Sequence, residues 1–337
     1  MSLRTGLRIV LIGSVGSSRR TLLGLIRHRT NVVGVLGLSA TRASGVSGYC
    51  RLDDLAEEIG SPYKEFLNIN DPEIVALVQS WAPDLIFVVG LSQLVKAPMM
   101  ALPRLGCVGF HPTLLPQGRG RAPVAWLALG ACPGAATFFV LEDEADAGPI
   151  LVQEPFPVTS EDYASDIINN LEEAIDRALA RWLPRLLAGE WQPLPQDKAL
   201  VSYCGRRTPE DGLIEWTASA KEIHALVRAA SRPHPGAYTY VGDFKLRVWR
   251  ATIETQMRAH GVVGRIFTLD QRERALVQTG DGLIWLDETE FVHEDAELRP
   301  PALRAGLQLG YAMQEEIHRV RQRLIQLEAK LQESKGT

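Results

Sequence analysis

Short apolar runs alternate with amphipathic segments along the N-terminal part of the chain. The runs are rich in Val, Ile and Leu, and the segments between them place apolar residues at helical spacing, as at Leu22, Leu23 and Ile26. Strands separated by helices form a parallel sheet with right-handed crossovers. The expected strands are 8–12, 32–38, 84–89, 107–110 and 136–141, and the expected helices are 18–28, 53–59, 71–81, 123–129 and 163–187.

The pattern changes after residue 189. A stretch rich in Pro and Gln at 189–197 resembles a linker, and a further amphipathic helix is expected at 219–231. Several short strands separated by glycines follow, which is typical of a small β-barrel. These strands are expected at 238–240, 245–250, 262–267, 275–278 and 283–286.

A heptad pattern occupies the C-terminal segment after Gly310. Apolar residues recur there at spacings of four and three, with charged residues on the other faces, which is typical of a coiled-coil seam. A single helix that packs on its own domain would show the same spacing. We expect a homodimer joined at least partly by this helix. The seam residues are Met313, Ile317, Val320, Leu324, Leu327 and Leu331.

Composition and charge narrow the class of protein. The net charge is −4 and there is no Lys/Arg-rich run, so we expect a small anionic substrate and no nucleic-acid partner. The longest apolar run, 85–91, is too short to span a bilayer, so no membrane partner is expected. The four cysteines are scattered without metal-ligand spacing, and no cleavable signal is evident. We expect a cytoplasmic enzyme with buried thiols and no metal.

A glycine- and serine-rich loop at 13–18 follows the first strand. It lacks the third glycine of a dinucleotide-binding motif, and no Gly-Lys-Ser/Thr follows, so it is neither that motif nor a P-loop. Two interpretations remain. The loop is a tight turn that leads into a helix, or its backbone N–H groups and hydroxyls at Gly13 and Ser14 hold a substrate phosphate or carboxylate.

The segment 109–121 carries the strongest candidate for chemistry. His111 precedes a proline at the expected end of a strand, and the proline limits the backbone freedom of the histidine. A titratable ring on a constrained backbone suits general acid–base catalysis. Arg119 and Arg121 follow in the loop and could bind a carboxylate or phosphate.

A second segment brings a carboxylate to the same edge. Asp146 follows the strand expected at 136–141, and ligands of open parallel sheets bind at the carboxyl ends of the strands. We therefore expect His111 and Asp146 to share one cleft.

Four blocks of sequence, in order, resemble the folate-dependent formyltransferase family, and most closely its sugar N-formyltransferases. The resemblance covers roughly residues 85 to 250. It implies an α/β fold with a Rossmann-like parallel-sheet N-terminal domain at 1–204, a smaller OB-like β-barrel domain at 205–300, and a C-terminal helix at 301–337. The blocks are the HPTLLPQGRG loop at 111–120, TFFVLEDEADAGPIL at 137–151, RTPEDGLIEW at 207–216 and LVRAASRPHPGAY at 226–238.

The resemblance implies transfer of a formyl group from N10-formyltetrahydrofolate to a primary amine, most plausibly of a nucleotide-linked amino sugar. His111 would accept or relay the amine proton, and Asp146 would hold the ring tautomer or anchor and deprotonate the ammonium group. The expected folate contacts are Val89, Gly90, Leu91, Ser92, Leu115, Arg119, Gly120, Asp143 and Ala145, and the expected substrate contacts are Gly13, Ser14, Arg121 and Arg228.

One position departs from the family pattern. The best-known members carry Asn-x-His, in which the Asn lies on the same face as the His and serves as oxyanion donor or formyl anchor. The corresponding residue here is Gly109. A backbone N–H, a water molecule or the Gln117 amide remain as donors, and a different one-carbon group is an alternative to formyl.

Other functions remain open at this stage. Methionyl-tRNA formyltransferase is disfavoured by Gly109 and by the acidic balance, and antibiotic or amino-acid amines are alternative acceptors. A non-catalytic relative that serves as a binding module is disfavoured because both His111 and Asp146 are retained.

Overall fold

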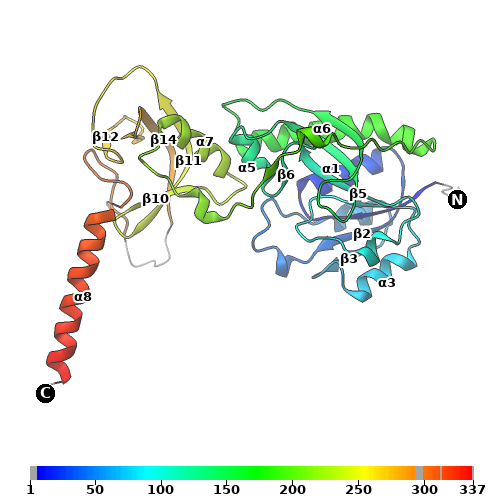
Figure 1. Ribbon diagram of the computed structural model, residues 1–337, viewed down its shortest axis with the longest axis horizontal. Helices are drawn as coiled ribbons and strands as arrows, with labels where there is room; N and C mark the ends of the chain where they lie inside the picture. The colour runs from blue at the N-terminus through cyan, green and yellow to red at the C-terminus, as the bar shows by residue number, and fades with distance from the viewer. Residues whose placement is uncertain (1–5, 293–298, 312, 336–337) are drawn as a thin grey trace. The chain divides into compact units, whose positions relative to one another are not determined.

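The computed structural model describes residues 6–292, 299–311 and 313–335, and the side chains of 6–292, 299–311 and 314–331. The chain forms two compact units (Figure 1). The first comprises Met1–Pro209 with Ser231–Pro235, and the second comprises Glu210–Ala230 with Gly236–Thr337. The helix and strand bounds agree with the sequence pattern to within a few residues for most elements.

The first unit is an α/β layer structure. Its main strands are β1 (Arg8–Ile12), β2 (Asn31–Leu38), β3 (Tyr63–Phe66), β4 (Leu85–Val88), β5 (Cys107–Thr113), β7 (Gly134–Val140) and β8 (Ile150–Pro155), with short β6 (Arg119–Gly120) and β9 (Tyr203–Cys204). Its helices are α1 (Gly16–Arg27), α2 (Asp53–Glu58), α3 (Pro72–Ser80), α4 (Ala97–Met100), α5 (Pro123–Ala128) and α6 (Ala164–Leu187).

The seven-stranded sheet has the order β3-β2-β1-β4-β5-β7-β8. The first five strands are parallel, as expected, but β7 is antiparallel to β5 and β8 is antiparallel to β7. The carboxyl end of β7 therefore lies beside the start of β5, with Val140 opposite Val108. The expectation that β7 ends at the same edge as the parallel strands is wrong, and the chain after β7 must turn back to bring Asp146 to His111.

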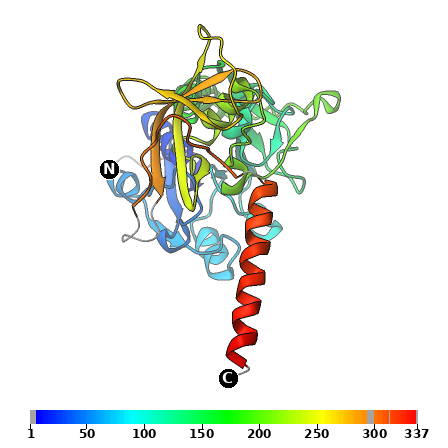
Figure 2. The same cartoon turned by 90° about the vertical axis from the view of Figure 1, so that its left-hand side faces the viewer.

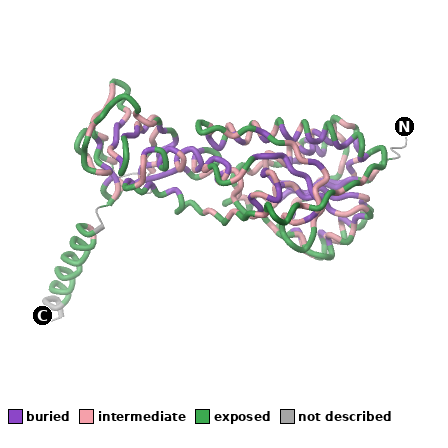
Figure 3. The backbone as a smooth tube through the Cα atoms, turned by 45° about the horizontal axis from the view of Figure 1, so that its top comes forward, coloured by how far each residue is buried: buried purple, intermediate pink, exposed green. Residues whose placement is uncertain are grey.

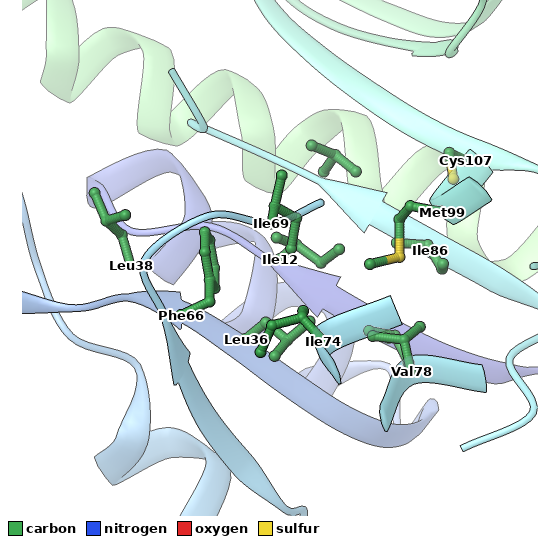
Figure 4. Close-up of a cluster of buried hydrophobic side chains, with 12 residues drawn as sticks. Ile12, Leu36, Leu38, Phe66, Ile69, Ile74, Val78, Ile86, Met99 and Cys107 are labelled. Atoms are coloured by element: carbon green, nitrogen blue, oxygen red, sulfur yellow. The ribbon is translucent and has the colours of Figure 1, made fainter. Parts of the chain in front are cut away.

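Helices cover both faces of this sheet. On one face α6 packs on α1, α5, β7 and β8. On the other face a cluster of buried side chains joins the sheet to α3 and α4 (Figure 4). Alternate residues of β1 and β2, such as Val10, Ile12, Leu36 and Leu38, enter this cluster because successive strand residues point to opposite faces. The parallel strands β1, β2, β4 and β5 are largely buried on both sides, which holds their ends and the attached loops in place.

The second unit contains a five-stranded antiparallel sheet in the order β10-β11-β14-β13-β12, drawn in yellow to orange in Figure 2. This confirms the smaller β domain that the short strands predicted. Helix α7 (Ala220–Ala230) packs on β11. The strands are β10 (Ala237–Val241), β11 (Phe244–Glu254), β12 (Ile266–Leu269), β13 (Ala275–Gln278) and β14 (Leu283–Val292).

A long helix, α8 (Met313–Lys335), follows Gly310, as the heptad pattern predicts. Its described side chains are exposed along nearly the whole helix (Figure 3). Met313, the first expected seam residue, begins the helix, and its side chain lies outside the described ones. Within the described ranges no helix combines the length and apolar character needed to cross a bilayer.

Candidate active site

His111 and Asp146 lie together in the first unit. The imidazole Nδ1 is 3.7 Å from the Asp146 carboxylate Oδ2. His111 belongs to β5 rather than to the loop after it, and its side chain is buried between strands, whereas the Asp146 side chain keeps some exposure to solvent. The two groups are too far apart for a direct hydrogen bond and close enough for one small donor group to contact both.

A backbone carbonyl fixes the orientation of the imidazole. The His111 Nε2 lies 2.9 Å from the Gly118 carbonyl oxygen. A carbonyl only accepts hydrogen bonds, so Nε2 carries a proton, and Nδ1 of the neutral ring presents its lone pair towards Asp146. Gly118, rather than Asp146, therefore holds the tautomer of the neutral ring. The role expected for Asp146 as anchor of the ammonium group stays a prediction.

The carboxylate is held by the same short loop. The Gly120 N–H donates to Asp146 Oδ2 at 2.9 Å. Gly120 has φ = 117°, and a Cβ there would lie 2.3 Å from the Cys204 carbonyl oxygen, so only glycine fits this close approach. Asp146 itself has φ = 58°, a left-handed conformation that Asp and Asn adopt more readily than most residues. The backbone of residues 118–120 therefore positions both the imidazole and the carboxylate.

The Arg119 side chain connects this loop to neighbouring segments of the chain. Its guanidinium is buried, donates to Gln196 Oε1, and forms an ion pair with Glu144 at 3.0 Å. The Gln196 amide in turn donates to the carbonyls of Asp146 and Gly148. Gln196 thus ties the Arg119 loop to the Asp146 loop. This role of Gln196 was not predicted, because the residue lies in the stretch that resembled a linker.

A cleft of about 560 Å³ lies beside these loops, and neither His111 nor Asp146 is among its lining residues. This volume falls within the range of small-molecule sites in proteins. Arg119 and Gln196 form part of its wall, so the residues that brace Asp146 also face the cleft. The other lining residues are Glu142, Glu144, Ala147, Pro149, Pro195, Lys198, Val201 and Tyr203.

The position of the family asparagine is filled by apolar side chains. A Cβ added at Gly109 would lie 2.5 Å from Leu141 Cδ2 and 2.7 Å from Phe139 Cζ. Phe139 is the cross-strand neighbour of Gly109 and is buried, so its ring has little room to move. The site thus has a hydrophobic wall where relatives carry an amide.

We expect Gly109→Asn to destabilise the protein by about 1–3 kcal/mol, because it overpacks the space held by Leu141 and Phe139. It should also fail to raise kcat. Urea unfolding and steady-state kinetics measure the two effects. Gly130→Asn is the control, since Gly130 has open space around it and a φ of 73° that Asn tolerates. Equal stability of the two variants would contradict this account of the wall.

The loop at Gly13 and Ser14 was expected either to form a tight turn or to bind substrate. Ser14 is buried, and its hydroxyl accepts a hydrogen bond from the Leu38 N–H, so this oxygen supports the sheet. A Cβ at Gly13 would meet the Val89 carbonyl oxygen. Both observations agree with the tight-turn interpretation of the loop, and a role of Gly13 and Ser14 in substrate binding stays a prediction.

The expected folate contacts outside Arg119 and Gly120 lie in three segments of the first unit. Val89, Gly90, Leu91 and Ser92 directly follow β4, whose last residue pairs with Gly109 of β5. Leu115 is buried, whereas Asp143 and Ala145 are exposed in the loop that carries Asp146.

The two expected substrate arginines differ in exposure. Arg121 is exposed, and Arg228 is a buried residue of α7 in the second unit.

The four thiols are unsuited to nucleophilic catalysis. All are free, and only Cys107 is fully buried, so the expectation of four buried thiols is correct for one. Burial raises the pKa of Cys132, near the 118–120 loop, to about 12, and burial also raises the pKa of its neighbour Cys204. Both remain protonated at neutral pH. In the described part of the chain, no three His, Cys, Asp or Glu side chains gather as metal ligands would.

Two family models match the sequence. The model described as formyl transferase matches residues 17–183, and the model described as formyl transferase, C-terminal domain, matches residues 206–297. Together they cover the β5–β7 site and the antiparallel sheet of the second unit. They confirm the resemblance that the four sequence blocks indicated.

Solved structures share the fold. HypX from Aquifex aeolicus, solved in complex with tetrahydrofolic acid, is 18% identical, with a TM-score of 0.60 over 85% of this chain and 44% of HypX. This chain therefore spans less than half of HypX. WlaRD, a sugar 3N-formyl transferase solved in the presence of dTDP and 5-N-formyl-THF, is 15% identical, with a TM-score of 0.62 over 86% of this chain and 99% of WlaRD.

Methionyl-tRNA formyltransferase from Clostridium thermocellum is 16% identical, with a TM-score of 0.54 over 85% of this chain and 99% of that enzyme. At identities of 15–18%, the similarity to these structures shows a shared fold only.

Proposed function

We propose that this chain, which belongs to the formyl transferase family, transfers a formyl group from N10-formyltetrahydrofolate to the amine of a nucleotide-linked amino sugar. The observation that carries the proposal is the 3.7 Å separation of His111 Nδ1 and Asp146 Oδ2. The backbone of the 118–120 loop holds the imidazole at Nε2 and the carboxylate at Oδ2. A pair arranged in this way suits the deprotonation of an ammonium group.

The proton transfer follows from the tautomer. Nδ1 and Oδ2 are both acceptors when the imidazole is neutral and the carboxylate ionised. An ammonium group between them donates to both, and the imidazole then takes its proton while the carboxylate stabilises the imidazolium. The free amine attacks the formyl carbon, and as the bond from that carbon to the folate nitrogen breaks, the imidazolium protonates the leaving nitrogen. The neutral imidazole then accepts the second proton of the attacking nitrogen and releases it to solvent, which leaves a neutral formamide. Asp146 thus acts as anchor and counter-charge.

The oxyanion that forms at the formyl carbon needs a donor in place of the family asparagine. Gln117 lies in the loop after β5, and its carbonyl accepts from the Thr113 hydroxyl at 2.8 Å, which fixes its backbone near His111. Its side-chain amide is the candidate donor of this chain, beside a backbone N–H or a water molecule.

We expect Gln117→Ala to cost roughly 2–4 kcal/mol of transition-state stabilisation, measured as a fall in kcat, if the amide donates to the oxyanion. Gln117→Glu, of similar shape but negatively charged, should fall at least as far. Full activity in Gln117→Ala would assign the contact to a backbone amide or to water instead.

The choice of acceptor rests on charge. The chain carries a net charge of −4, which opposes binding of a large polyanion such as tRNA, while the exposed Arg121 suits the diphosphate of a single nucleotide sugar. The dTDP of the WlaRD structure is a group of this kind. The cleft of about 560 Å³ is compatible in size with a large part of the folate.

The proposal is tested by mass spectrometry. The protein is incubated with N10-formyltetrahydrofolate and, separately, with nucleotide-linked amino sugars, amino acids, aminoglycosides and methionyl-tRNA. We expect an added formyl group on a nucleotide-linked amino sugar and none when the folate is omitted. Formylation of methionyl-tRNA alone would favour the second candidate, and an adduct of different mass would identify another one-carbon group. No product with any acceptor would contradict the proposal.

A further inference from the structure

Helix α8 presents a stripe of exposed apolar side chains. Five seam residues are exposed by 46–60%, although they are large and hydrophobic. A contiguous apolar surface of this kind on a helix marks an interaction site. The residues of the stripe are Ile317, Val320, Leu324, Leu327 and Leu331.

The spacing of the stripe assigns a heptad register. Taking Ile317 as position a, the a positions are Ile317, Leu324 and Leu331, and the d positions include Val320 and Leu327. Most a positions hold leucine, so the seam residues do not by themselves select the number of strands, which the mass measurement decides. Ile325 falls at position b, outside the stripe, although it is also exposed.

The flanking charges indicate the orientation of a partner helix. In a parallel coiled coil each g residue faces the e residue five positions later in the other chain. Here Glu316 and Arg323 occupy g positions, and Arg321 and Glu328 occupy the e positions five residues later. A second copy of α8 in register therefore places Glu316 opposite the partner's Arg321 and Arg323 opposite the partner's Glu328. Symmetry doubles both attractive pairs, which outnumber the one like-charged pair of this register, at the next g and e positions, Lys330 and Lys335.

Antiparallel pairing has no such surplus of attractive pairs. One antiparallel register sets Arg323 and Arg321 each against the same residue of the partner, and these like pairs offset the attraction between Glu316 and the partner's Lys330. The other sets Arg323 against the partner's Lys330, and this repulsion offsets the attraction between Arg321 and the partner's Glu328. The charges therefore favour the parallel arrangement over these two.

We propose that α8 pairs with the α8 of a second copy of this chain as a parallel, in-register, two-stranded coiled coil. The occupant of the stripe is a second copy because the charges along its edges complement those of an identical helix. The inference is independent of the catalytic chemistry, since no residue of α8 belongs to the proposed active site.

The first test measures the mass of the full-length chain by light scattering over a dilution series. We expect twice the chain mass of 37.1 kDa. Leu324→Lys should dissociate the dimer to monomer, because it places a charge in the middle of the seam. Ile325→Lys is the matched control, since its side chain is 57% exposed against 56% for Leu324 and lies off the seam. A monomeric full-length chain, or dissociation of both variants alike, would overturn the proposal.

Charge reversal tests the orientation. Arg323→Glu places Glu opposite the partner's Glu328, and Glu328→Arg places Arg opposite the partner's Arg323, so each single variant should raise the dissociation constant at low salt. The double variant restores opposite charges in a parallel dimer and should regain the affinity. An antiparallel dimer would not be weakened by Arg323→Glu alone, because residue 323 would then face the partner's Lys330 or the same residue of the partner; unchanged or higher affinity of this single variant would overturn the parallel orientation. Arg323→Glu also places Glu four residues after Arg319, so circular dichroism should show that the helix persists.

Discussion

His111→Ala and His111→Gln are both expected to lower kcat by about two or more orders of magnitude, the usual scale for a positioned acid or base. Alanine removes the whole ring. Glutamine keeps an N–H that can donate to the Gly118 carbonyl, as the imidazole Nε2 does, and removes only the titratable Nδ1 that faces Asp146. The pair of variants thus separates proton transfer from support of the loop.

The control for this experiment is His260→Ala, which changes an exposed histidine of the second unit. It should leave kcat unchanged. Thermal unfolding of each variant checks that the fold persists. If His111→Gln retains full activity while His111→Ala does not, the ring only anchors the loop and the assignment of a base is wrong.

Asp146→Asn is expected to lower kcat by a similar factor, about a hundredfold or more. Asparagine has almost the same shape, tolerates the left-handed backbone at φ = 58°, and can still accept from the Gly120 N–H. The substitution therefore keeps the loop and removes the negative charge that anchors the ammonium group and balances the imidazolium.

Asp243→Asn, at an exposed position of the second unit, serves as the control. We expect the loss in Asp146→Asn to appear in kcat/KM as well, because the carboxylate also binds the ammonium group. Unchanged kinetics in a folded Asp146→Asn protein would show that the carboxylate is only a brace for the loop.

The sequence predicted most of the elements because their periodicity is strong. The apolar runs that became β1, β2 and β4 are buried on both faces, and α6 carries a regular apolar face. The edge strand β3 was missed, since its middle residues Lys64 and Glu65 are charged and no alternation is visible in four residues. Strand direction is set by tertiary pairing, so the antiparallel β7 had no signal in its own residues.

The candidate site shows the same limit. His111 and Asp146 were expected to meet, and they do, but through a loop that returns from the far end of β7 rather than through neighbouring strand ends. Gln196 was missed because a glutamine in a Pro-rich stretch resembles any surface residue, and only the folded chain brings it to Arg119. The replacement of an amide by Phe139 and Leu141 likewise depends on contacts across the sheet.

The hydrogen bond from the Gly120 amide to Asp146 supplies the enzyme with a built-in spectroscopic reporter. The NMR chemical shift of an amide proton that donates to an ionised carboxylate depends on the charge of that carboxylate. An ammonium group that binds between His111 and Asp146 would donate to the same carboxylate oxygen. We therefore expect the chemical shift of the Gly120 amide to change on binding, before any turnover. Titration by NMR with unreacted acceptors then ranks candidate substrates without the folate, and it does so on the unmodified chain.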